Sequence, residues 1–281
     1  TARGVYRVTQ TIPVTADMRE LRLLFPEWLP GNHAARGPIN LISGIRFTAG
    51  GKVLEWKRNP LDVYELIVDL PEGTSAVTAQ FVHTSPITGS EGRITMTQEM
   101  LNLQWEKMSF YPAGHYVRRI AVKPTVKVPE GWRVFTALDG QARKNDTVTW
   151  QTVDYETLVD SPIFAGKYAQ QWKLDDDVRL DAVDAFDGHL VVSYRADALP
   201  RIQLWPVDES GYGRPSDITF DSELMSVGLS ANPNWRAPKM RIGATSFVTP
   251  VQIYDLDLAS GERTLLREQP VLGDYRPEDY V

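Results

Sequence analysis

The chain has 281 residues and a formal net charge of −6, with 30 Lys and Arg against 36 Asp and Glu. This length suits one large domain or two ordinary ones, and an acidic chain without a run of basic residues argues against a nucleic-acid surface. The absence of cysteine excludes disulfides, thiolate metal sites and cysteine nucleophiles. No apolar stretch approaches the roughly 18 residues of a membrane-spanning helix, so we expect no membrane partner.

Alternation of apolar and polar residues with a period of two is the dominant pattern along the chain, and it is typical of half-buried β-strands. Helical periodicity is weak, and only residues 155–159 suit a short helical segment. The clearest hairpin joins residues 254–258 to 263–266 through a turn at 259–262. The sequence therefore predicts a mainly β protein, with strands in 19–23, 122–128, 148–153, 190–195, 201–205 and 251–256.

A run rich in proline, FPEWLPGNHAARGPINLISGI, occupies residues 25–45. Proline fixes φ and removes a donor, and glycine admits backbone angles closed to other residues. The run therefore predicts a shaped, semi-rigid loop, either a scaffold corner of a β domain or the border of a cleft. Its candidate residues are Trp28, Pro30, Gly31 and His33.

Catalytic motifs are absent from the sequence. The H-E-x-x-H motif of zinc peptidases does not occur, because each histidine stands alone and none has a neighbouring glutamate. The G-x-S-x-G elbow of serine hydrolases does not occur either; the nearest stretches, 88–92 and 228–232, do not fit it. Paired carboxylates of the glycosidase type stay open, since their separation is spatial. We predict no catalytic residue, no metal and no cofactor. The four histidines are His33, His83, His115 and His189.

The tryptophans and one acidic run each allow a structural and a functional interpretation. The tryptophans suit core packing, with an aromatic platform for a sugar or a peptide as the alternative. The acidic run at 173–177 suits a solvated turn better than a calcium loop, and it marks a seam in the pattern. The tryptophans are Trp28, Trp56, Trp105, Trp132, Trp150, Trp172, Trp205 and Trp235.

The first part of the chain resembles a known family. Its motifs look like those of the N-terminal β domain of the glycyl aminopeptidases, zinc metallopeptidases that often carry a PDZ domain. The resemblance spans about residues 1–183 and implies a β-sandwich or saddle-like domain; the thermolysin-like domain that it also implies does not follow. His33 departs from the pattern, where an aromatic is expected. The motifs are FPEWLPG (25–31), LNLQW (101–105), YPAG (111–114), PEGW (129–132) with TAL (136–138), and YETLVDSPIFAG (155–166).

The second part resembles a different peptidase. Residues 189–195, 218–221, 245–250 and 254–258 look like propeller strands of the prolyl oligopeptidase family, close to oligopeptidase B. Residues 271–281 are similar to the point where such proteins leave the propeller for the hydrolase domain. The resemblance implies a partial β-propeller of antiparallel blades over 184–281, with no counterparts of the family's catalytic serine, aspartate and histidine.

The two resemblances predict a fusion of 1–183 with 184–281, of natural, engineered or artefactual origin. In both parent families such regions shape substrate access, so we expect a non-catalytic accessory region with a peptide or a catalytic peptidase domain as partner. The alternatives are a peptidase whose catalytic domain lies outside this chain and a carbohydrate- or protein-binding β module.

An incomplete propeller leaves strand edges uncovered. We therefore expect the C-terminal part to pack on the N-terminal domain, to oligomerise through these edges, or to be marginally stable. Lack of cysteine leaves the compartment open between cytoplasm and periplasm. No signal peptide is evident, although a chain that opens on Thr1 is compatible with a removed leader.

Overall fold

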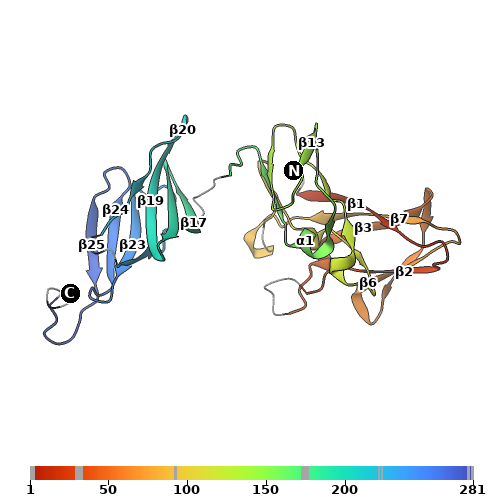
Figure 1. The fold of residues 1–281 in the computed structure, drawn as a ribbon, viewed down its shortest axis with the longest axis horizontal. Coiled ribbons are helices and arrows are strands. Elements are labelled where there is room, and N and C mark those ends of the chain that lie inside the picture. The colour runs from red at the N-terminus through yellow and green to blue at the C-terminus, as the bar shows by residue number, and fades with distance from the viewer. Residues whose placement is uncertain are drawn as a thin grey trace. The chain divides into compact units, whose positions relative to one another are not determined.

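A computed structural model describes residues 4–28, 34–91, 94–171, 177–220, 222, 224–276 and 279. The chain forms two compact units, Thr1–Gln171 and Trp172–Val281 (Figure 1). Both consist mainly of antiparallel strands, so the predicted fold class is confirmed. The expected boundary after residue 183 falls inside strand β17 (Val178–Phe186), which pairs along its length with β18 (His189–Ala196). A boundary there would divide one hairpin, whereas the division after Gln171 leaves it whole.

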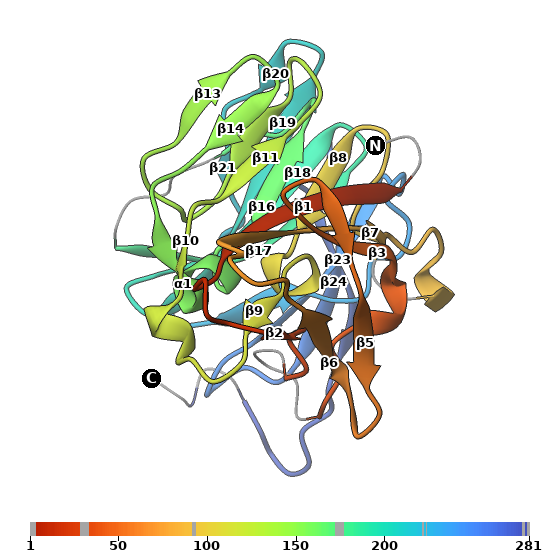
Figure 2. The same ribbon diagram turned by 90° about the vertical axis from the view of Figure 1, so that its right-hand side faces the viewer.

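Two four-stranded sheets form the first half of unit 1, and both can be followed in Figure 2. Their inward side chains share one apolar cluster around Phe47, Phe81 and Phe110. Buried and less buried residues alternate along the strand at 76–84, whereas the strand at 62–69 buries four residues in succession. At the tight turn between β3 (Ile42–Ala49) and β4 (Lys52–Leu54), Gly50 and Gly51 both have positive φ, as hairpin turns of this type require. The first sheet has the order β1 (Val5–Pro13), β7 (Ala76–Thr84), β3 (Ile42–Ala49) and β4 (Lys52–Leu54), and the second the order β5 (Trp56–Asn59), β6 (Asp62–Asp69), β2 (Glu20–Leu24) and β9 (Tyr111–Pro112).

Smaller sheets form the second half of unit 1 around a cluster that contains Trp132, Trp150 and Tyr155. The predicted helical segment is α1 (Tyr155–Val159), and no helix among the described residues is long and apolar enough to cross a membrane. The sheets are β12 (Arg133–Phe135), β16 (Ile163–Gly166) and β8 (Met100–Leu103); β11 (Thr125–Lys127), β14 (Thr147–Thr149) and β13 (Ala142–Lys144); and β10 (Ala121–Val122) with β15 (Val153–Asp154). Short 3-10 turns are η1 (Ile39–Leu41), η2 (Gly89–Glu91), η3 (Trp105–Lys107) and η4 (Val117–Arg119).

Two predicted strands of unit 1 are each divided between two sheets. Residues 122–128 contribute to β10 and β11, and the chain leaves one sheet for the other at Pro124, which has no N–H for a continuous ladder. Residues 148–153 likewise contribute to β14 and β15, because their partners are the same two strands. The alternation of side chains continues across the first break, so the period alone does not reveal it, whereas in the second stretch the alternation slips at Gln151 and Thr152, two exposed polar residues in succession.

Unit 2 consists of two antiparallel meanders of the propeller-blade type, which confirms the predicted partial propeller. One small cluster, with Ile202, Met240 and Ile242 among its fully buried members, lies within the unit. The predicted hairpin at 254–266 is present, and the Asp257 carboxylate accepts the backbone N–H groups of its turn. The first sheet comprises β17, β18, β19 (Leu199–Asp208) and β20 (Gly211–Tyr212) with β21 (Ser216–Asp217) beside β19, and the second comprises β22 (Ser226–Leu229), β23 (Lys239–Thr245), β24 (Gln252–Asp257) and β25 (Arg263–Glu268).

Candidate functional site

The proline-rich segment after β2 is a closed corner in the part that the structure describes. The Glu27 carbonyl accepts a hydrogen bond from the Gly37 N–H at 2.9 Å, and Trp28 and Ala35 form an isolated antiparallel bridge. A Cβ at Gly37 would lie 1.9 Å from the carbonyl oxygen of Pro26, so this close approach of two backbones requires glycine. The two ends of the loop are therefore fixed to each other.

The candidate residues of this loop are described only in part. Trp28 is 64% exposed at the start of the loop. Pro30, Gly31 and His33 lie outside the described residues. Their assignment to a scaffold corner or to the border of a cleft stays a prediction.

Motif residues from distant parts of the sequence meet in one hydrogen-bond network. The indole N–H of Trp105 donates to the Ser161 carbonyl at 3.0 Å, and the Ser161 hydroxyl donates to the Thr157 carbonyl at 2.7 Å. The Ser109 hydroxyl donates to the Trp105 carbonyl at 2.6 Å, and the Tyr155 hydroxyl lies 2.9 Å from Ser109 Oγ. Because a carbonyl can only accept, the Ser109 hydroxyl donates its hydrogen bond to Trp105, and Tyr155 therefore donates to Ser109. Both serine hydroxyls therefore hold the fold.

Tyrosines link this network to the strand that precedes the proline-rich loop. Tyr111 pairs with Leu24 across β9 and β2, and its ring lies 5.2 Å from that of Tyr155. Burial, with the nearby carboxylates of Glu27 and Asp62, raises the pKa of Tyr111. Burial also raises the pKa of Tyr155, so both phenols keep their protons at neutral pH. A protonated phenol that donates to Ser109, as that of Tyr155 does, suits a packing role.

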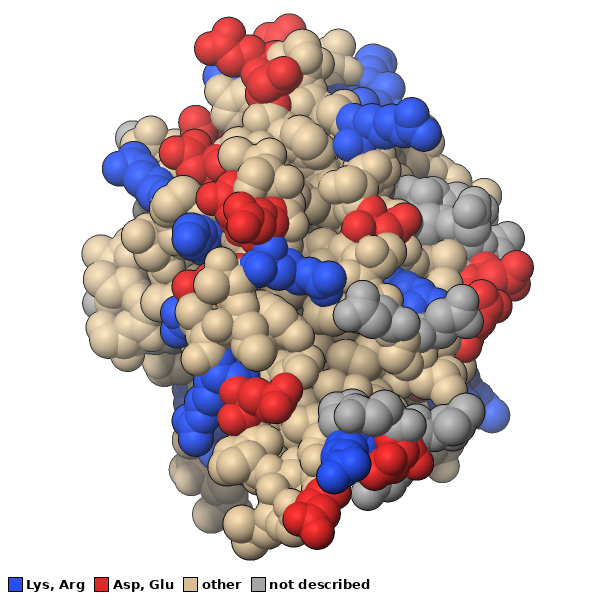
Figure 3. Space-filling view, turned by 90° about the vertical axis from the view of Figure 1, so that its left-hand side faces the viewer, with Lys and Arg blue, Asp and Glu red and all other residues tan. Residues whose placement is uncertain are grey.

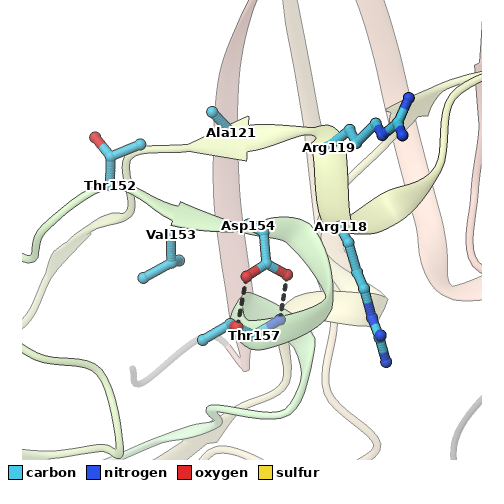
Figure 4. A pocket seen from close by; sticks show the side chains of 7 residues that line it. All are labelled: Arg118, Arg119, Ala121, Thr152, Val153, Asp154 and Thr157. Carbon is cyan, nitrogen blue, oxygen red and sulfur yellow. Dashed lines mark hydrogen bonds between the residues drawn. The ribbon is translucent and has the colours of Figure 1, made fainter.

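An open depression of about 470 Å³ lies beside α1 (Figure 4). At its base, one carboxylate oxygen of Asp154 accepts the Thr157 N–H at 3.0 Å and the other accepts the Thr157 hydroxyl at 2.7 Å. These hydrogen bonds lower the pKa of Asp154 and make it the N-cap of α1. The depression is lined by Arg118, Arg119, Ala121, Thr152, Val153, Asp154 and Thr157.

The two arginines of the depression also have partners within the fold. Arg118 forms a two-point ion pair with Glu156, with Nη2 at 2.8 Å from Oε1 and Nε bonded to Oε2, which lowers the pKa of Glu156. The Arg119 guanidinium lies 5.7 Å from the centre of the Tyr116 ring. In Figure 4 the two arginine side chains point in different directions. The lining residues contain no histidine or serine that could form a nucleophile–base pair.

The sequence analysis did not single out Asp154 or Arg118. The signal for Asp154 was present, because an aspartate directly before a helical segment is a typical N-cap. Arg118 has no comparable signal, since its partner lies far away in the sequence. The described part of the chain contains no group of three or more His, Cys, Asp or Glu side chains suited to a metal ion. The acidic run at 173–176 lies outside that part; Asp177 is at an exposed turn.

The face of the molecule drawn in Figure 3 shows no strong separation of charge by sign. The face in Figure 3 carries lysine and arginine side chains interspersed with aspartate and glutamate. Isolated pairs such as Arg241 with Asp255, at 3.1 Å, are typical of such a surface. This pattern suits neither a phosphate backbone nor a strongly charged ligand.

Comparison with known proteins identifies both units as N-terminal domains of peptidases. Residues 1–167 match the peptidase M61 N-terminal domain, and residues 170–269 match the prolyl oligopeptidase N-terminal beta-propeller domain. The first match covers more than half of the chain, and the chain belongs to the family of the peptidase M61 N-terminal domain. Both resemblances found in the sequence are thus confirmed.

The relatives that the chain matches are much longer than the matched part. Dipeptidyl aminopeptidase BI of Pseudoxanthomonas mexicana is 37% identical over 106 residues, which are 38% of this chain and 14% of that protein. An aminopeptidase N family protein from Idiomarina loihiensis has 15% identity and a TM-score of 0.48, over 72% of this chain and 30% of its own. Oligopeptidase B from Trypanosoma brucei has 20% identity and a TM-score of 0.37, over 66% and 26%. The family assignment rests on the sequence matches.

Proposed function

We propose that the two units are a non-catalytic accessory region of a peptidase, which shapes the access of peptides to a catalytic domain or docks that domain. Two peptidase-type N-terminal domains in direct succession support this proposal. The absence of H-E-x-x-H and G-x-S-x-G from the sequence supports it as well.

The observation that carries the proposal is the use of the family motifs in unit 1. The motif residues Trp105, Tyr155 and Ser161 donate their hydrogen bonds to backbone carbonyls or, for Tyr155, to Ser109, which itself donates to the Trp105 carbonyl. A nucleophilic serine instead needs a base within hydrogen-bond reach, and a catalytic phenol needs a pKa close to the working pH. The motifs therefore support a packing role for this region.

Peptide reporters provide the test of this proposal. With the purified 281-residue chain, glycyl- and arginyl-peptide reporters should be hydrolysed no faster than in buffer alone, with or without added zinc. Hydrolysis that a chelator or a serine-reactive phosphonate abolishes would contradict the proposal. Ser109→Ala and Ser161→Ala are matched variants that show whether such activity belongs to unit 1 or to a contaminating peptidase.

The partner in this proposal is a catalytic peptidase domain, outside this chain or on another polypeptide, or the peptide itself. Intact mass of the native protein, together with the neighbouring genes, tests the first arrangement. A larger native polypeptide with a hydrolase domain would identify the partner directly. A native polypeptide without one, and without a peptidase encoded nearby, would leave peptide binding as the remaining form of the proposal.

A carbohydrate- or protein-binding module is the second candidate, and exposed tryptophans favour it. Trp28 is 64% exposed and Trp235 is 53% exposed, whereas Trp132 and Trp150 are buried, as core packing predicts. A ligand on an exposed indole should change its fluorescence, and Trp28→Ala or Trp235→Ala should remove that change. Unchanged fluorescence across a panel of glycans and peptides would count against this candidate.

We also propose that unit 2 self-associates through its outer strands. Leu180 and Val183 on β17, and Leu265 and Leu266 on β25, are each about half exposed. Each of these strands also contains a register shift, which limits edge-to-edge pairing and favours weak association. Sedimentation equilibrium should show a mass that rises with concentration, less so for Leu265→Lys. A monomer mass at every concentration would contradict self-association.

A further inference from the structure

His83 is a fully buried histidine in unit 1 whose ring nitrogens have no hydrogen-bond partner among the described residues. Its residue surface is 1% exposed, and neither Nδ1 nor Nε2 reaches a protein donor or acceptor there. It lies on β7, directly opposite Tyr6 of β1 and Ile42 of β3. A buried neutral imidazole without partners is costly, and a buried imidazolium without a counter-ion is more so. This position therefore accepts only the neutral ring.

Among the described residues, the groups that face His83 bring no compensating negative charge. The Tyr6 ring lies 6.0 Å away, edge to face, and its hydroxyl donates to the Thr95 carbonyl at 2.7 Å. Burial raises the pKa of Tyr6, so the phenol is neutral. From η3, the ammonium of Lys107 opposes a second positive charge. From β3, the cross-strand neighbour Ile42 brings no titratable group.

The location of His83 is the place where the two apolar clusters of unit 1 meet. Tyr6, its cross-strand neighbour, belongs to the cluster of Trp132 and Trp150. Phe81, two residues earlier on the same face of β7, belongs to the cluster of Phe47 and Phe110. The half-buried Val8 packs against both clusters. A charge at His83 would therefore be placed between two cores at once.

We propose that His83 is an acid-sensitive joint of unit 1: the neutral ring allows the two cores to pack together, and protonation in acid opens β1 and β7 around it.

The sign of the effect follows from the protonation of the open chain. Burial, with a smaller contribution from Lys107, lowers the pKa of His83 from 6.5 to about 4. The open chain therefore binds the proton first as the pH falls. The stability is complete above pH 6.5 and is lost progressively between pH 6.5 and pH 4. At pH 5 the equilibrium constant for opening should exceed its value at pH 8 by roughly thirtyfold through this group alone.

Region-resolved hydrogen exchange of the full chain tests the proposal. After correction for intrinsic rates, peptides from β1 and β7 should open more easily at pH 5 than at pH 8. His83→Phe should remove most of this difference, and the matched control His115→Gln, at an exposed histidine of the same unit, should leave it unchanged. An equal acid response in the chain and in His83→Phe would overturn the proposal, because carboxylates would then account for it.

A second measurement does not depend on the folding of a variant. In NMR spectra of the chain labelled at histidine, the His83 ring should stay neutral down to pH 5. His83→Gln assigns the signal if His83→Phe does not fold. Titration of His83 near pH 6.5 in the folded chain would overturn the proposal.

Discussion

The two units of the chain bury their strands to different degrees. Unit 1 contains two apolar clusters that contact common residues such as Val8, and polar side chains join its parts. The Gln10 amide, for example, donates to the Phe110 carbonyl at 2.6 Å and accepts the Phe110 N–H at 3.0 Å. Unit 2 contains one cluster, with eight buried residues among those described. Unit 1 is therefore the better-buried of the two.

The difference in burial indicates that unit 2 depends more than unit 1 on contacts outside itself. In β17 every residue except Phe186 is exposed or half-buried, and Phe247 and Leu272 are fully exposed. Blades of a propeller normally cover one another around a ring, and two sheets alone leave their outer strands uncovered. We expect unit 1 to be stable on its own contacts and unit 2 to be the less stable of the two.

Removal of a central ring from unit 1 should have the largest effect. Phe110 is fully buried and its ring contacts those of Phe25, Phe47 and Phe81. Phe110→Ala should lower the free energy of unfolding of unit 1 by about 3–5 kcal/mol, because it leaves a cavity. Denaturant unfolding followed by hydrogen exchange measures this. Phe247→Ala, at a fully exposed ring, is the control and should change little; equal effects would contradict the assigned cores.

A smaller truncation in unit 2 should lower the free energy of unfolding by less than Phe110→Ala does, but it should unfold more of its own unit. Ile242 is fully buried in the single cluster of unit 2. Ile242→Ala should cost about 2–4 kcal/mol, a larger share of a smaller stability. Exchange protection should vanish from β22 to β25 while unit 1 keeps its own. Retained protection in unit 2 would show that its core is larger than the cluster around Ile242.

The closed corner after β2 should fail if its glycine is replaced. Gly37→Ala places a Cβ against the Pro26 carbonyl, and we expect a loss of about 1–3 kcal/mol in unit 1. Thermal unfolding measures the loss. Gly89→Ala is the matched control, because a Cβ there meets open space. Similar stability of both variants would show that the corner is not a fixed part of the scaffold.

The smallest expected effect is the loss of one buried hydroxyl. Tyr155→Phe removes the donor to Ser109 and should cost about 1 kcal/mol. Tyr194→Phe in unit 2 removes a hydroxyl bonded to Asp217 at 3.2 Å on an exposed surface and should cost less. Urea unfolding of both variants compares them. A reversed order would contradict the assignment of the Tyr155 network to the fold.

Period-two alternation and turn residues are local signals, and from them the sequence predicted the mainly β fold, the blade hairpin and the short helix. It did not single out long strands such as β1, β6 and β7. It placed α1 at 155–159 and the hairpin turn at 259–262. It did not reveal the break after Val122, since alternation continues there through the change of sheet. The break after Thr149 was also missed, although the alternation slips at Gln151 and Thr152. The burial of His83 and the network of Ser109 depend on residues far away in the chain. Such contacts leave no local pattern.

Hydrogen exchange of the unsubstituted chain, dilute and verified as a monomer, tests the central comparison most directly. Residues 76–84 in β7 and 100–103 in β8 should retain slow exchange, whereas residues 190–270 should exchange faster. Equal protection of the two units, in a monomer whose units do not contact each other, would contradict the account. Two uncovered blades would then be as stable as unit 1 with its two apolar clusters.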